Sequence, residues 1–294
     1  MRITNQMMTQ NAIRHLNANR ERMADLQTQI ASGKQYQVVS DNPSAATQSM
    51  LLRSQTSMTQ TYLEITQAAD DWLSANELAL SQLISLGSRA LTLGYNGISD
   101  TQGDQERRTF ADEVNALIQE AVDLGNSSHK DNYLFSGHRI LTRPFILVDA
   151  NTIVYNGDEE KIQVKTSPDT SLTLNIDGGA LKPFMEALIE LRNALQSEPF
   201  DRIRLTNAIG NLSTQLDNIK TARSVNGARQ REVRAQMNFL TRAQNELKAL
   251  LSQKEDANIA EAISLLRNQE ATYQATLEVT RRAISVTSLF DLLR

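Results

Sequence analysis

The chain has 294 residues, of which 30 are basic and 34 acidic, and its formal net charge is −4. With no basic surplus, no dense basic run and no cysteine, it lacks the charge pattern of a nucleic-acid-binding protein, and it can form neither disulfides nor thiolate metal sites. No stretch reaches the roughly 18 apolar residues of a membrane span, and the N-terminus lacks the apolar core of a cleavable signal peptide, so we expect neither membrane insertion nor signal cleavage.

Residues 1–39 carry a hydrophobic stripe at heptad spacing. Its apolar members are Ile13, Leu16, Met23 and Ile30, and its remaining positions hold Arg20 and Gln27. The stripe predicts an amphipathic helix that needs a partner, because isolated helices draw most of their stability from packing. Gly33 suits the left-handed position after a helix, so we expect this helix to stop there.

Residues 40–93 carry the longest stripe. Steps of four and three from Leu51 reach Gln55, Met58, Tyr62, Ile65, Ala69, Trp72, Asn76, Ala79, Leu83, Leu86, Ala90 and Leu93. A repeat of 3.5 residues kept this long is typical of a coiled-coil seam. The alternative is a long amphipathic helix in an ordinary bundle. Asn42 can cap this helix, Pro43 suits its first position, and its length would be roughly 80 Å.

The next segments predict a helical hairpin followed by strands. Residues 94–97 indicate a turn, after which a heptad from Phe110 to Leu124 can fold back along the long helix. From residue 138 to 183 strand-like residues replace the heptads. Residues 152–155 and 161–164 flank a Gly-containing loop and predict a hairpin, and residues 172–176 predict a third strand.

Helical patterns return after residue 183 and break near Pro199. A further long heptad track runs from Val233 to Leu251. It then slips by one residue at Ile259, where the polar stretch 254–258 predicts a joint. Asn258 has capping-box spacing to Glu261 and can start the final helix. We expect this last helix to pair with the first one.

These patterns predict a mainly α fold: an elongated antiparallel coiled coil or helical bundle with paired N- and C-terminal helices and a small β-rich insertion. We expect a terminal assembly domain from residues 1–39 and 258–294. Residues 40–138 and 180–257 are expected to form a helical rod, and residues 139–179 the variable insertion.

No cluster of residues indicates catalysis. His15, His129 and His138 are scattered, and the acidic residues within 100–106 lack the alternating ligands and central glycine of an EF-hand. Phosphate-loop and Gly-x-Ser-x-Gly patterns are absent from the sequence. We therefore expect no catalytic, cofactor-binding or metal-binding residues. Two other classes remain: an intracellular coiled-coil adaptor, and a hydrolase within residues 139–179, although that segment lacks a convergent polar triad.

Several segments resemble the bacterial flagellin family, and within it the proteins of the hook–filament junction more than flagellin itself. They are Arg2-Ile3-Thr4, Ala31–Lys34, Ser40–Ala46, Asn132–Gly137, Ser224–Arg229 and Ser288–Arg294. Each segment is weak alone, and their order and spacing over nearly the whole chain carry the resemblance. In one departure, Asn226 stands before Gly227, at an expected helix start where relatives often carry a hydrophobic residue.

The resemblance implies a structural protein that passes unfolded through the flagellar export channel, without a cleaved signal peptide, and ends up extracellular in the flagellum. It would form the layer between the other hook-associated junction protein and the flagellin filament. A minor flagellin or filament subunit is the alternative. The implied partners are neighbouring copies of the chain, the other hook-associated junction protein, flagellin, and an export chaperone that reads the C-terminal helix.

We expect an assembly and core seam along the stripes and the terminal motif. Its residues are Ile13, Leu16, Met23, Ile30, Met58, Ile65, Trp72, Leu83, Ile263, Leu266, Tyr273, Leu277, Leu289 and Phe290. Because Arg20, Gln27 and Glu270 interrupt the terminal stripes, we expect the terminal helices to fray in the isolated protein. Such helices would become ordered when neighbours bury their apolar faces.

Overall fold

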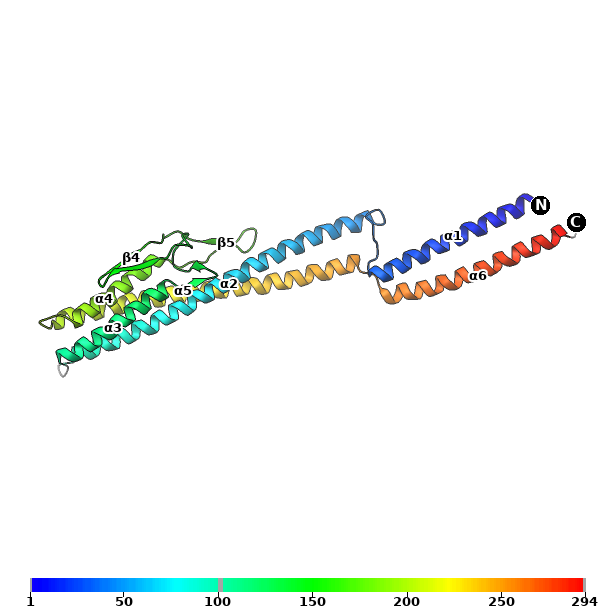
Figure 1. Cartoon of the computed structure of the whole chain (residues 1–294). Coiled ribbons are helices and arrows are strands. Elements are labelled where there is room, and N and C mark those ends of the chain that lie inside the picture. The colour runs from blue at the N-terminus through cyan, green and yellow to red at the C-terminus, as the bar shows by residue number, and fades with distance from the viewer. Residues whose placement is uncertain (1, 100–102, 293–294) are drawn as a thin grey trace. The chain divides into compact units, whose positions relative to one another are not determined.

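The computed structural model describes residues 2–99 and 103–292, and within them the chain is mainly α-helical, as predicted (Figure 1). The α-helices are α1 (Arg2–Ser32), α2 (Pro43–Ile98), α3 (Asp104–Gly125), α4 (Lys182–Leu195), α5 (Arg202–Glu255) and α6 (Ile259–Leu292). The chain divides into two compact units, one of residues 1–58 with 243–294 and one of residues 59–242. This division falls inside α2 and α5. The domain boundaries expected from the sequence lie between helices and stay a prediction.

The helix ends in the smaller unit follow the local signals of the sequence. Gly33 has a positive φ of 69° directly after α1, as expected for the left-handed residue that ends a helix. The side chain of Asn42 accepts a hydrogen bond of 3.0 Å from the backbone N–H of Ala45, which caps α2. Asn258 accepts in the same way from Glu261 at the start of α6, at 3.3 Å. These three predictions are confirmed.

The larger unit is built around one hydrophobic core to which α2, α3, α4 and α5 all contribute. Helices α3 and α4 pack against each other. The fully buried side chains at the centre include Leu80, Leu83, Ile118, Phe184, Leu188, Leu191 and Leu212. Burial of apolar surface contributes about 25 cal/mol per Å², so a core of this kind holds four helices together without further partners.

The turn predicted at residues 94–97 is wrong, because α2 continues through them to Ile98. A Cβ atom on Gly94 would lie 2.9 Å from Cγ1 of Ile209 and 3.0 Å from Cδ1 of Leu191. The glycine therefore allows α4 and α5 to pack closely against α2. Here glycine serves helix packing and leaves the helix unbroken.

The strands form three antiparallel pairs: β1 (Ser128–His129) with β2 (Asn132–Tyr133), β3 (Phe145–Asp149) with β4 (Thr152–Tyr155), and β5 (Gln163–Lys165) with β6 (Ser171–Thr173). The predicted hairpin between 152–155 and 161–164 is wrong. Instead β4 pairs with β3, which sequence reasoning missed, and Ile146 lies opposite Val154. Only two residues separate β3 from β4, and a short loop costs less entropy to close than a longer one.

The insertion is attached to the core by the segment 132–137. Leu134, Phe135 and Ser136 are buried, and the hydroxyl of Tyr155 donates a hydrogen bond of 2.9 Å to the carbonyl oxygen of Phe135. Burial raises the pKa of Tyr155 to about 12. Gly137 follows with a φ of 68°, a conformation that glycine adopts without strain. This segment therefore ties the insertion to the helices.

Two asparagines are fully buried between α2 and α5. Asn226 donates from Nδ2 to the carbonyl oxygen of Leu73 at 2.9 Å, and Asn76 donates from Nδ2 to that of Leu174 at 3.1 Å. The helix start expected near Gly227 is wrong, because α5 runs unbroken through this point. The polar side chain of Asn226 is accommodated at this buried position because it forms a hydrogen bond to α2. A buried asparagine of this kind favours one register between paired helices.

Candidate assembly surface

Helices α1 and α6 pack side by side in the smaller unit, so the predicted pairing of the terminal helices is confirmed (Figure 1). The contact between them buries little. Among the described side chains of the two helices, Ala262 and Asn19 are buried. Asn19 accepts a hydrogen bond of 3.0 Å at Oδ1 from Nε2 of Gln269. Over its described side chains, the helix pair therefore has no buried core of its own.

Some of the expected seam residues of α1 and α6 lie half-buried, and others are exposed to solvent. Leu16, Met23, Ile30, Leu266 and Tyr273 are half-buried. The exposed members are Ile13 at 50%, Leu277 at 42% and Ile263 at 38% of their full surface. The side chains of Leu289 and Phe290 lie outside the described residues.

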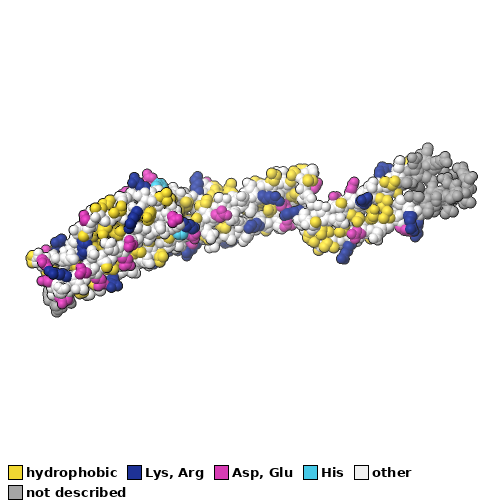
Figure 2. All heavy atoms as spheres, viewed as in Figure 1, with side chains coloured by type: hydrophobic (Ala, Val, Ile, Leu, Met, Phe, Trp, Pro, Cys, Tyr) yellow, Lys and Arg dark blue, Asp and Glu magenta, His cyan; other side chains and the backbone are white. Residues whose placement is uncertain are grey.

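Further apolar side chains of these helices are also open to solvent, and Figure 2 shows hydrophobic groups gathered on the visible face of α1 and α6. Beyond the seam, the exposed residues are Met7, Ile259, Leu265 and Val279. Apolar side chains gathered on one face of a soluble protein, as Figure 2 shows for these helices, are typical of an interaction site. The terminal helices therefore present an apolar face that their mutual contact leaves uncovered.

The expected seam residues of α2 lie in different surroundings. Leu83 is fully buried in the core of the larger unit, and Trp72 packs against that core half-buried. Ile65 is half-buried, whereas Met58 is 55% exposed. The long stripe thus changes along its length from an open surface near residue 58 to a closed core near residue 83.

A polar cluster, which sequence reasoning missed, lies where the chain passes between helices in the smaller unit. Residues 33–42 connect α1 to α2, and residues 256–258 connect α5 to α6. The two connections are bonded through their backbones: the N–H of Gln35 donates to the carbonyl oxygen of Glu255 at 2.7 Å, and the N–H of Ala257 donates to that of Gly33 at 2.8 Å. The termini of four helices are therefore fixed to one another here.

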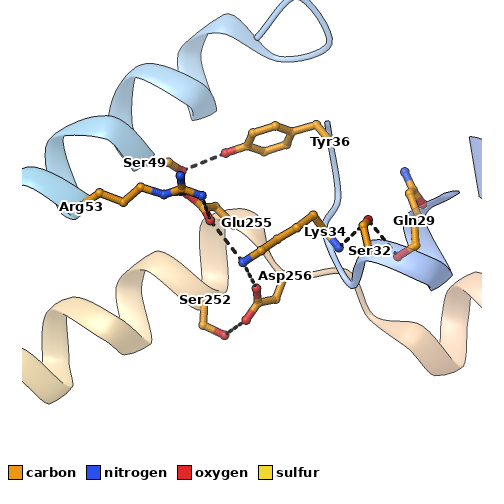
Figure 3. Close-up of polar contacts among 9 residues, drawn as sticks. All are labelled: Gln29, Ser32, Lys34, Tyr36, Ser49, Arg53, Ser252, Glu255 and Asp256. Carbon is orange, nitrogen blue, oxygen red and sulfur yellow. Dashed lines mark hydrogen bonds and ion pairs between the residues drawn. The ribbon is translucent and has the colours of Figure 1, made fainter. Parts of the chain in front are cut away.

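The side chains around these backbone bonds form an ion-pair network, which we call the Glu255 clasp (Figure 3). It consists of Lys34, Arg53, Glu255 and Asp256. Arg53 donates to both carboxylate oxygens of Glu255, from Nε at 2.9 Å and from Nη2 at 2.7 Å. The Nζ of Lys34 lies 3.2 Å from Glu255 Oε2 and donates to Asp256 Oδ1 at 2.7 Å. Each carboxylate of the clasp therefore faces a cation.

The clasp shifts the protonation equilibria of its members. The Arg53 guanidinium, with Lys34 beside it, holds the pKa of Glu255 below its usual value. Hydrogen bonds from Lys34 and then from Ser252 hold the pKa of Asp256 below its usual value. The same carboxylates, Asp256 first, raise the pKa of Lys34. All of these shifts favour the charged forms.

Among the described residues, no His, Asp and Glu side chains form a group that could hold a metal ion. His138 contacts Glu160 at 2.5 Å, and His129 packs edge-on against Trp72. None of the helices in the described ranges is long and apolar enough to span a membrane.

The described part of the terminal helix pair thus leaves apolar side chains exposed on a mainly helical chain. Residues 3–139 match the model of the bacterial flagellin N-terminal helical region. Over these residues, which make up a little under half of the chain, the protein is similar to the bacterial flagellin family.

Two similar proteins are both described as flagellar hook-associated protein 3. The one from Salmonella typhimurium is 24% identical over 185 residues, which is 62% of this chain and 56% of that protein. The one from Escherichia coli is 24% identical over 222 residues, or 75% of this chain and 67% of that protein. A solved structure described as a flagellar hook-associated protein of Vibrio parahaemolyticus shares the fold. It has a TM-score of 0.67 and 16% identity, and the match covers 74% of this chain and all of that one.

Proposed function

We propose that the chain is a structural component of the bacterial flagellum that forms the junction layer between the hook and the flagellin filament. Its partners in this role are neighbouring copies of itself, the other hook-associated junction protein on the hook side and flagellin on the filament side. The names of the two similar hook-associated proteins support this proposal. We assign the chain no catalytic role and no cofactor.

The observation that carries the proposal is the uncovered apolar face of the terminal helices. Ile13, Ile263 and Leu277 are exposed in a helix pair whose contact buries few side chains. Isolated helices are marginal in water, so this pair gains most of its stability only when other helices cover its face. Copies that meet through unlike surfaces build rings or helical layers, which is the geometry a junction needs.

This reading assigns the assembly role to residues 1–39 and 258–294, with the expected seam residues inside these two ranges as the contacts. Helix α6 would also be the segment that a cytoplasmic export chaperone holds before secretion. An amphipathic helix can place its apolar face in a groove of such a partner. Export of the unfolded chain, without cleavage of a signal peptide, would then place the protein outside the cell.

A minor flagellin is the second candidate, because the matching family model describes flagellin itself. Deletion of the gene separates the two. We expect bare hooks by electron microscopy and unassembled flagellin in the medium, because exported flagellin would find no surface to join. Normal filaments on the deletion strain would exclude the junction role and favour a minor flagellin.

A further inference from the structure

The terminal helix pair is connected to the rest of the smaller unit only through the two connections, which raises the question of what holds it in place. The direct contact between α1 and α6 leaves much of their apolar surface exposed. The connections, by contrast, are fixed by backbone hydrogen bonds through Gln35 and Ala257 and by an antiparallel bridge between Lys34 and Asp256. The polar contacts are therefore densest at the connections.

Glu255 occupies an unfavourable position unless the clasp is closed. It is the last residue of α5, where the helix dipole disfavours a negative charge, and its side chain is only 5% exposed. A carboxylate buried at such a point needs compensating partners. Arg53 from α2 and Lys34 from the first connection supply two cations. Removal of either cation leaves this carboxylate short of a partner.

Neighbouring contacts extend the clasp to three helices, α1, α2 and α5. The hydroxyls of Tyr36 and Ser49 lie 2.8 Å apart, which joins the first connection to α2. Gln29 near the end of α1 donates to the carbonyl oxygen of Gln35 at 2.8 Å. Ser252 on α5 lies 2.5 Å from Asp256. The network thus includes side chains from α1, α2 and α5 and from both connections.

We propose that the Glu255 clasp is a built-in lock that couples the last turn of α1 and the first turn of α6 to α2 and α5. When the clasp is closed, the backbone bonds between the connections hold α1 and α6 in one arrangement. When it is open, both connections become free to move and the pair reorients. The inference rests on the contacts of this unit and does not depend on the junction role.

The test uses the full chain and its lack of cysteine. The variant Glu255→Gln keeps the shape of the side chain and removes its charge. We expect the N–H groups of Gln35 and Ala257 to exchange with solvent about tenfold faster, because a charge-assisted hydrogen-bond network contributes somewhat more than a neutral one and Arg53 is partly solvated. Arg53→Met removes the other side of the bidentate pair and should give the same result.

A distance measurement reports on the arrangement itself. Spin labels on Gln27→Cys in α1 and Lys248→Cys in α5 flank the clasp, and both positions are exposed. We expect one narrow distance distribution in the otherwise unchanged chain and a broad one after Glu255→Gln. Arg223→Met is the matched control, since it breaks the Arg223–Glu77 ion pair of 2.6 Å in the larger unit.

Three outcomes would overturn the proposal. The first is unchanged exchange and an unchanged distance distribution in both Glu255→Gln and Arg53→Met. The second is a broad distribution with the clasp intact. The third is equal acceleration of exchange in α3 and α4, which would mean that the variants destabilise the whole chain. In the double variant, the two changes should cost less than the sum of the single changes, because both remove the same contact.

Discussion

The same heptad pattern has a different structural outcome in the two units of the chain. In the larger unit, the stripe of α2 meets three other helices, and members such as Leu83 are fully buried. In the smaller unit, α1 and α6 pack against each other, and Ile13 and Leu277 remain exposed. Heptad spacing therefore indicates that a helix face is suited to packing against other helices. Whether the chain itself buries that face depends on how many of its own helices pack there.

The largest effect is expected in the core of the larger unit. Phe184→Ala removes a fully buried ring and should lower the free energy of unfolding by about 3–5 kcal/mol. Phe239→Ala is the matched control, because that ring on α5 is 59% exposed. Denaturant unfolding followed by circular dichroism measures both. Equal losses in the two variants would contradict a single closed core.

The buried asparagine pair should give the next largest effect. Asn226→Ala removes the buried side-chain hydrogen bond to the carbonyl of Leu73 and should cost about 1–3 kcal/mol. Asn218→Ala, on the exposed side of the same helix, should cost less than about 0.5 kcal/mol. Thermal unfolding compares them. A stabilising effect of Asn226→Ala would show that the hydrogen bond contributes nothing to α2–α5 pairing.

Acid should open the Glu255 clasp while the larger unit stays folded. Glu255 and Asp256 have lowered pKa values, so their contribution to stability is present above their unfolded-state pKa values, about 4, and is lost as the pH falls through the lower folded values. Lys34 has a raised pKa, so its contribution is lost only when the pH rises through that raised value. The distance distribution between labels at 27 and 248 should broaden below about pH 4 and stay narrow at neutral pH. An unchanged distribution after both carboxylates have been protonated would contradict this linkage.

The smallest effect on the isolated chain is expected on α6. Leu277→Ala removes a side chain that is already 42% exposed, so it should change the free energy of unfolding by less than about 0.5 kcal/mol. Leu277→Asp should also leave the monomer folded but should fail to restore filaments in a deletion strain, because a charge would then face the neighbouring helices. Restoration of normal filaments by Leu277→Asp would show that Leu277 is not part of the assembly surface.

Local signals predicted the helices well, because caps and heptads act within a few residues. Gly33, Asn42 and Asn258 mark helix ends where the sequence placed them. The turn predicted at Gly94 was wrong, because this glycine serves the close approach of Ile209, which is more than a hundred residues away in the sequence. The pairing of β3 with β4 was missed because the strand at 145–149 showed no alternation that set it apart.

The Glu255 clasp could not be predicted from the sequence, because its members are distant in the chain and polar. Arg53 and Glu255 meet only after two long helices bring them together. The polar stretch 254–258 indicates a joint between helices, but its composition does not show that Glu255 and Asp256 form ion pairs with Arg53 and Lys34. The solvent exposure of the seam residues on α1 and α6 could not be predicted either, since a heptad pattern does not give the number of helices that pack together.

Hydrogen exchange of the full chain, measured first as a monomer and then in assembled flagella, tests most directly whether the terminal helices are completed by neighbours. In the monomer, we expect residues 5–30 to exchange much faster than residues 80–93 of α2, with protection rising toward the clasp. In the assembly, the same terminal residues should become as protected as the core. Equal protection of residues 5–30 and 80–93 in the monomer would contradict the proposal, because the terminal pair would then be stable alone.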